Sequence, residues 1–106
     1  MKRVCFLMRI KKGLVEAYKK AHEPVWPEMI EAMRKAGIRN YSMFLRPDGL
    51  LGGYFEAENP QKSLGKVGKT DVNRRWQERM APYFESGSGD LRKGGPEWLE
   101  QIFYME

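Results

Sequence analysis

Four runs of alternating apolar and polar side chains limit the folds open to this chain of 106 residues more than any other feature. Such alternation is typical of β-strands with one buried face. The runs span residues 4–10, 39–45, 50–58 and 98–104. Helical spacing separates the first run from the second and the third from the fourth, so any fold must accommodate strands and helices in that order.

The second and third runs are separated by the turn motif Arg46-Pro47-Asp48-Gly49. Proline presets the backbone angle at the second position of a turn, and Asp-Gly tolerates the chain reversal. An antiparallel hairpin over residues 39–58 is therefore predicted. Asn59-Pro60 ends the hairpin, and the weakly patterned residues up to 69 carry no predicted element.

Two consecutive helical patterns lie between the first and second strands. Leu14 and Tyr18 share one face of the first helix, and Pro24 predicts that this helix ends near His22 or Glu23, because the residue before a proline resists helical angles. Proline is tolerated in the first turn of a helix, so a second helix is predicted to start at Pro24 or Pro27.

A third helix is predicted to start at Thr70-Asp71, which offers an acceptor side chain and an early negative charge. Val72, Trp76, Met80 and Tyr83 share its apolar face, and Pro82 predicts an end around Met80 or Ala81. Residues 85–96 are rich in glycine, serine and charge, and they are long enough to be a flexible lid or simply a surface excursion.

Strand, helix, strand, strand, helix, strand is the order of a ferredoxin-like sandwich, an α+β fold with helices on one face of an antiparallel sheet. The length suits a single such domain over residues 1–106. The second sheet face would carry side chains too apolar to stand in water, including Phe44, Tyr54 and Phe103. We therefore expect a symmetric homodimer, a dimeric α/β barrel that buries this face.

The composition argues against several classes of partner. The net charge of +5 raises the question of nucleic acid, yet the lysines and arginines occur as scattered pairs and not as a stripe. No apolar stretch is long enough to cross a membrane, and no signal peptide is recognised. We expect neither nucleic acid nor a membrane as partner and, from the single cysteine, Cys5, a cytoplasmic location. One cysteine and one histidine also fall short of a zinc site, so no metal is expected.

His22 is the only histidine, and its imidazole group, with an ordinary pKa of about 6.5, can act as an acid or a base near neutral pH. Tyr18 lies four residues earlier, on the same face of the predicted helix. The helix C-terminus favours a protonated imidazole, and Pro24 and Pro27 rigidify the segment. The pair is therefore a candidate proton-transfer site, although two core residues with polar tips bonded to carbonyls would show the same pattern.

Tyr41 and Trp76 also fit two interpretations. Aromatic residues at these spacings are commonly part of the core. They could equally line a pocket in which the rings lie against the C–H face of a ligand while their polar tips bind hydroxyl groups, an arrangement suited to sugars.

Residues 22–28, with Tyr18 before them, resemble the signature of the L-rhamnose mutarotases. Asn40-Tyr41-Ser42, Thr70-Asp71-Val72 with Trp76, and Gln101-Ile102-Phe103-Tyr104 resemble further motifs of that family in the same order. The resemblance spans nearly the whole chain. It implies a dimeric ferredoxin-like isomerase, without metal or organic cofactor, that interconverts the α and β anomers of a deoxysugar.

The resemblance also implies roles for individual residues. His22 would donate the proton, and Tyr18, Tyr41 and Trp76 would contact the sugar. The family carries adjacent tryptophans in the last helix, whereas Gln77 follows Trp76 here, which predicts an amide that binds hydroxyls in place of a stacking ring. The general base, and the choice between L-rhamnose and a relative such as fucose, stay open.

Other classes of protein share this order of elements. A cofactor-free or haem-handling monooxygenase of the dimeric α/β-barrel group, or a ligand-binding protein on that scaffold, is an alternative that the fold alone does not exclude. The polar tips of Tyr18, Tyr41 and His22 suit a sugar better than an apolar aromatic substrate. An RNA-recognition domain is disfavoured, because the third strand lacks the expected basic residue before its glycines and carries carboxylates instead.

Overall fold

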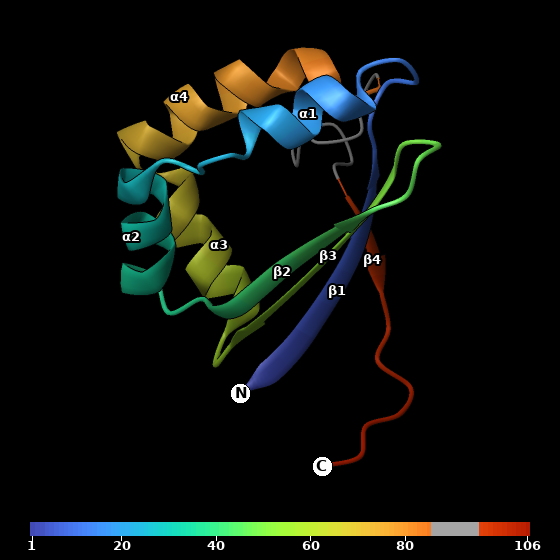
Figure 1. Cartoon of the computed structure of the whole chain (residues 1–106). Coiled ribbons are helices and arrows are strands. Elements are labelled where there is room, and N and C mark those ends of the chain that lie inside the picture. The colour runs from blue at the N-terminus through green and yellow to red at the C-terminus, as the bar shows by residue number, and fades with distance from the viewer. Residues whose placement is uncertain (86–95) are drawn as a thin grey trace.

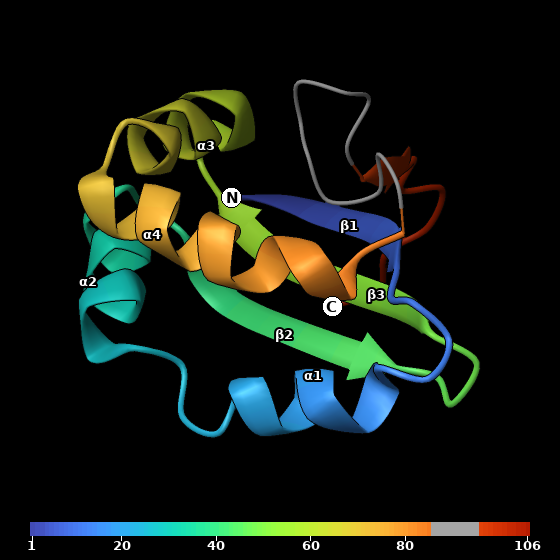
Figure 2. The same ribbon diagram turned by 90° about the horizontal axis from the view of Figure 1, so that it is seen from above.

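The structure, a computed structural model, describes residues 1–85 and 96–106. Figures 1 and 2 show that the helices lie together on one face of an antiparallel sheet. The strand order β2-β3-β1-β4 confirms the predicted ferredoxin-like fold of the chain. The elements are, in order, β1 (Lys2–Arg9), α1 (Val15–Ala21), α2 (Pro27–Lys35), β2 (Arg39–Leu45), β3 (Leu50–Ala57), α3 (Pro60–Gly68), α4 (Asp71–Met80), the 3-10 helix η1 (Ala81–Tyr83) and β4 (Glu97–Leu99).

The two central strands organise the core. β1 pairs with β3 along its whole length, from Lys2 opposite Ala57 to Arg9 opposite Leu50. Alternate residues of β3 point toward the helices and are buried, while those between them face the open side of the sheet, as expected for a strand with one covered face. The largest fully buried side chains are Phe55, Ile10, Leu51 and Met80.

The hairpin between β2 and β3 confirms the predicted turn. Gly49 has a φ of +98°, an angle that side chains other than glycine adopt at a cost. The Arg46 guanidinium donates from Nε and Nη2 to the two Asp48 carboxylate oxygens at 2.7 and 2.6 Å. This hydrogen-bonded pair lowers the pKa of Asp48 to about 2, so the turn keeps its negative charge over nearly all conditions.

Helix boundaries agree closely with the sequence pattern at three of the four helices. α1 ends at Ala21 with His22 as its C-cap, α2 starts at Pro27, and α4 starts after Thr70, whose hydroxyl accepts from the Asn73 backbone N–H at 3.2 Å. No helix in residues 1–85 and 96–106 is long and apolar enough to span a membrane.

α3 was not predicted from the sequence. Asn59 caps it by accepting from the Lys62 backbone N–H at 3.2 Å, and Pro60 occupies its first turn. Gly65 lies inside the helix, where glycine is unfavourable and obscures the pattern. Tertiary packing compensates, because Val67 is buried against the rest of the core.

The last strand is much shorter than the predicted 98–104. β4 comprises only Glu97–Leu99 and pairs with β1, after which residues 100–106 have no regular structure. Figure 1 shows this segment leaving the body of the molecule. Its alternation is that of a half-buried strand, but its side chains are exposed and Tyr104 contacts only the Arg3 guanidinium, so the prediction was wrong for residues 100–104. The predicted lid or excursion at 85–96 lies almost wholly outside the described residues.

Gly53 in β3 provides a test of the side-chain packing between β3 and β1. A Cβ at this position would overlap the ring of Phe6, which is itself packed by Phe55, whereas the nearest atoms to a Cβ at Gly52 lie 3.9 Å away. We expect Gly53→Ala to lower the free energy of unfolding by about 1–3 kcal/mol, because the buried Phe6 ring must move. Gly52→Ala, the matched control, should change it by less than about 0.5 kcal/mol. Urea unfolding of both variants measures this, and equal effects would contradict the packing described.

Candidate active site

The C-terminus of α1 fixes the orientation of the His22 ring. Nδ1 of His22 lies 3.0 Å from the main-chain carbonyl oxygen of Tyr18, one turn back along the helix. A carbonyl oxygen can only accept a hydrogen bond, so Nδ1 carries a proton and donates it. The second ring nitrogen, Nε2, is therefore a lone-pair acceptor when the ring is neutral and an N–H donor when the ring is protonated.

Three polar tips in this region are open to solvent or ligand. Nε2 of His22, the Tyr18 hydroxyl and Nε1 of Trp76 have no hydrogen-bond partner in residues 1–85 and 96–106. No side-chain nitrogen or oxygen of these residues is both enclosed and without a partner. The tips therefore remain accessible, even though the Tyr18 and Trp76 side chains are only 4% and 7% exposed. Buried rings with free polar ends are typical of ligand pockets.

Aromatic side chains from separate parts of the chain surround the imidazole. The Tyr18 ring centre lies 4.4 Å from that of His22, and the Trp76 ring of α4 meets His22 edge-on at 5.3 Å. Trp26, in the loop between α1 and α2, packs on Trp76 at 5.0 Å. Tyr83 packs on Tyr18 at 5.7 Å. The site is thus a cluster of rings built around the one histidine.

Tyr41 joins this cluster from β2. Its ring stacks on Phe55 with a centroid distance of 5.8 Å and an interplanar angle of 7°. Packing of its ring against Phe55 and Phe6 raises the pKa of Tyr41 to about 12, although 39% of the residue is still exposed. Burial also raises the pKa of Tyr18, and the electrostatic influence of the neighbouring Tyr41 raises it further. Both phenols therefore stay neutral near pH 7 and serve as hydrogen-bond donors and acceptors, not as bases.

Gln77 is placed differently from the other candidates. It follows Trp76 on α4, and neighbouring helical residues diverge by about 100° around the axis. Its side chain is exposed and donates from Nε2 to the Asn73 Oδ1 at 3.3 Å, along the outer surface of the same helix. The structure brings together His22, Tyr18, Tyr41 and Trp76 but not Gln77, whose part in sugar binding stays a prediction.

Sequence reasoning missed two members of the cluster. Trp26 lies between Pro24 and Pro27 in the same segment as His22, and this position is the signal that could have identified it. Tyr83 shares the helical spacing of Trp76 and Met80, which indicated a common apolar face but not a place beside Tyr18.

Fold and site together define a small ferredoxin-like protein with a single imidazole, one of whose nitrogens is free, in a cluster of aromatic rings and neutral phenols. The sequence model of the L-rhamnose mutarotase family matches residues 3–105. The chain belongs to that family, as its motifs indicated.

Relatives and solved structures agree with this assignment. An L-rhamnose mutarotase of Bacillus subtilis is 36% identical over 107 residues, covering 100% of each chain. One of Oceanobacillus iheyensis is 34% identical over the same length, again covering 100% of each chain. The crystal structure of an L-rhamnose mutarotase from Formosa agariphila superposes with a TM-score of 0.79 at 25% identity and covers 100% of both chains.

The pKa of Tyr41 predicts how stability depends on alkaline pH. An ordinary tyrosine in the unfolded chain ionises near 10, whereas folded Tyr41 ionises at about 12. Its contribution is therefore complete below pH 10 and is lost as the pH rises toward 12. We expect the free energy of unfolding to fall less steeply over this range in Tyr41→Phe than in the wild type, as measured by urea unfolding. The tyrosinate absorbance that the variant lacks should titrate near 12; a midpoint near 10 would contradict the burial of this phenol.

Proposed function

We propose that this chain is an aldose mutarotase that interconverts the α and β anomers of L-rhamnose or a closely related deoxysugar. The observation that carries the proposal is the free Nε2 of His22, whose ring is held in one orientation by the Tyr18 carbonyl within a cluster of aromatic rings. Family membership supports the same reaction, because the relatives named above are L-rhamnose mutarotases.

The reaction needs protons to move but no electrons. Ring opening places a proton on the ring oxygen and breaks its bond to the anomeric carbon, while the anomeric hydroxyl loses its proton and becomes the aldehyde oxygen. Rotation about the adjacent carbon–carbon bond turns the other face of the aldehyde toward the hydroxyl, and the reverse proton transfers close the ring. Each cycle returns the enzyme to its starting protonation state.

His22 is the proposed proton donor of ring opening, acting from Nε2 toward the ring oxygen. Tyr18 and Tyr41 remain neutral, so they are suited to hold sugar hydroxyls and not to take the anomeric proton as bases. Trp76 offers an apolar ring and an accessible N–H. Gln77 remains a candidate for binding sugar hydroxyls, which a substitution at this position would test.

The required acceleration is modest, because the sugar opens and recloses unaided in water. General acid–base catalysis by one positioned group contributes about 10²–10⁴-fold, which is enough for a useful mutarotase. A single imidazole with hydroxyl partners is therefore sufficient machinery.

The first test follows anomer exchange in freshly dissolved L-rhamnose by NMR. We expect the wild type to accelerate the exchange and His22→Ala to lose about 10²-fold or more of the catalysed rate, because the proton donor is removed. Lys20→Ala, at an exposed position beside the same helix end, is the matched control and should retain the rate. A His22→Ala variant as active as the wild type, or a wild type inert toward rhamnose and fucose, would refute the proposal.

We further propose that the working protein is a homodimer formed through the open face of the sheet. Apolar side chains on this face and beyond β4 are exposed to an extent that a monomer rarely tolerates in one region. The exposed fractions are 70% for Phe44, 89% for Ile102, 70% for Phe103, 50% for Tyr104 and 79% for Met105. A hollow of about 320 Å³ also opens on this face, beside Leu7, Phe44 and Leu50.

The cytoplasmic location expected from the single cysteine stays a prediction.

Measuring the oligomeric state tests this interface. The wild type should sediment as a dimer, twice the 12.4 kDa of one chain, at micromolar concentration. Phe44→Glu should shift it toward monomer, because a charge would be buried at the centre of the interface. Lys62→Glu, on the helical side of the molecule, should remain dimeric. A monomeric wild type, or a Phe44→Glu variant that stays dimeric, would count against this surface.

A further inference from the structure

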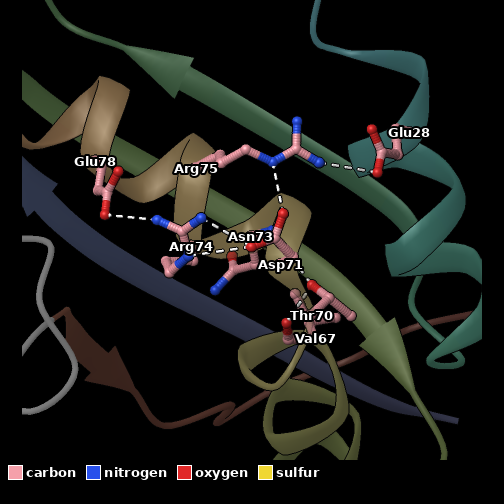
Figure 3. A network of polar contacts seen from close by, with 8 residues as sticks. All are labelled: Glu28, Val67, Thr70, Asp71, Asn73, Arg74, Arg75 and Glu78. Atoms are coloured by element: carbon pink, nitrogen blue, oxygen red, sulfur yellow. Dashed lines mark hydrogen bonds and ion pairs between the residues drawn. The ribbon is translucent and has the colours of Figure 1, made fainter.

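Two adjacent arginines of α4 make different connections. Figure 3 shows them side by side, with Arg74 bound only within its own helix. Arg74 donates to Asp71 at 2.8 Å and to Glu78 at 2.9 Å. Arg75 also donates to Asp71, at 2.9 Å, but its Nη2 reaches across to Glu28 in the first turn of α2 at 3.0 Å. Of these two arginines, Arg75 alone pairs with a residue of α2 in the part of the chain that the structure describes.

α4 makes a second connection at the same place, through Trp26. This residue immediately precedes α2, and its ring centre lies 6.0 Å from the guanidinium carbon of Arg75 and 5.9 Å from that of Arg79. These distances are at the outer limit of cation–π attraction. Trp76, one position after Arg75, packs on the same ring at 5.0 Å. One stretch of α4 thus holds Trp26 and, through Arg75, also Glu28.

The contacts continue from Trp26 to the candidate proton donor. Trp76 packs against Trp26 and also meets the His22 ring edge-on at 5.3 Å. His22 starts the short loop that Trp26 ends, so fixing Trp26 and Glu28 limits where that loop can run. The Tyr18 carbonyl fixes one side of the imidazole. The Tyr18 ring, at 4.4 Å, and the Trp76 ring pack on the imidazole, and Trp76 belongs to the helix that carries Arg75.

We propose that Arg75, through its ion pair with Glu28 and its position over Trp26, is a positioning residue for His22. It reaches the ring cluster only at Trp26 and does not contact the imidazole; it acts by setting the distance between α4 and the loop that connects α1 to α2. The catalytic part of the proposal rests on the mutarotase function proposed above, whereas the positional part does not.

The expected effect is on geometry and not on stability. The side chains of Arg75 and Glu28 are 42% and 65% exposed, and ion pairs of this kind add little to the free energy of folding. A small displacement of a catalytic group nevertheless lowers the rate, because proton transfer depends steeply on the distance and angle between the proton donor and its acceptor. Loss of Arg75 should therefore lower kcat while leaving a folded protein.

The test compares Arg75→Gln with Arg74→Gln, its neighbour and matched control, and uses Glu28→Gln as an independent way to break the same pair. Because His22 is the only histidine, its ring proton resonance is a unique NMR probe whose ring-current shift reports its distance from Trp76. We expect this resonance to move well beyond its line width in Arg75→Gln and Glu28→Gln but not in Arg74→Gln. Thermal unfolding of each variant establishes that it is folded.

Kinetics on L-rhamnose provide the second readout. Arg75→Gln and Glu28→Gln should each lower kcat by about fivefold with KM within about twofold, because misplacement of the acid affects the proton transfer and not sugar binding. An Arg75→Gln variant that behaves like Arg74→Gln, or a Glu28→Gln variant with an unmoved His22 resonance, would overturn the proposal. A wild type without mutarotase activity would refute the proposed function alone, since the resonance shifts would still report the positioning.

Discussion

A sheet with all its helices on one face is the constraint on which the rest of this structure depends. The covered face supplies the core, and every ring of the candidate site comes from the layer between β-sheet and helices or from its rim. The uncovered face has no such layer, and there Phe44 is 70% exposed. Because the helices cover only one face of the sheet, the ring cluster lies on that side and an apolar surface is left on the other. A homodimer would bury this surface.

Within the ring cluster, a single hydrogen bond determines which nitrogen of His22 can exchange a proton with a ligand. The Tyr18 carbonyl accepts from Nδ1 of His22 and so fixes the tautomer, which leaves Nε2 as the only ring nitrogen able to exchange a proton with a ligand. The raised pKa values of Tyr18 and Tyr41 separate the remaining roles, because neutral phenols bind hydroxyls but take up protons poorly. His22 is thus the side chain of this cluster best suited to proton exchange near neutral pH.

The sequence predicted elements whose signals are local. The turn at Asp48-Gly49, the end of α1 at His22 and the Thr70 cap of α4 each follow from chemistry within a few residues. α3 was missed because Gly65 masks a helix that packing stabilises. Residues 100–104 were misassigned because they alternate like a half-buried strand, yet their side chains are exposed in this chain. The placement of Tyr41 beside Tyr18 depends on the order of strands, which only the folded chain displays.

Residues 22–28, which carry the family resemblance, make several different contacts in this chain. His22 is the candidate proton donor, Pro27 starts α2, Trp26 packs on Trp76 of α4, and Glu28 pairs with Arg75. Apart from His22, the residues named here therefore make structural contacts at the junction of α1 and α2. The end of α1 contacts α4 through His22 and Trp76, and the start of α2 contacts it through Glu28 and Arg75. The position of the imidazole ring therefore depends on contacts from several directions.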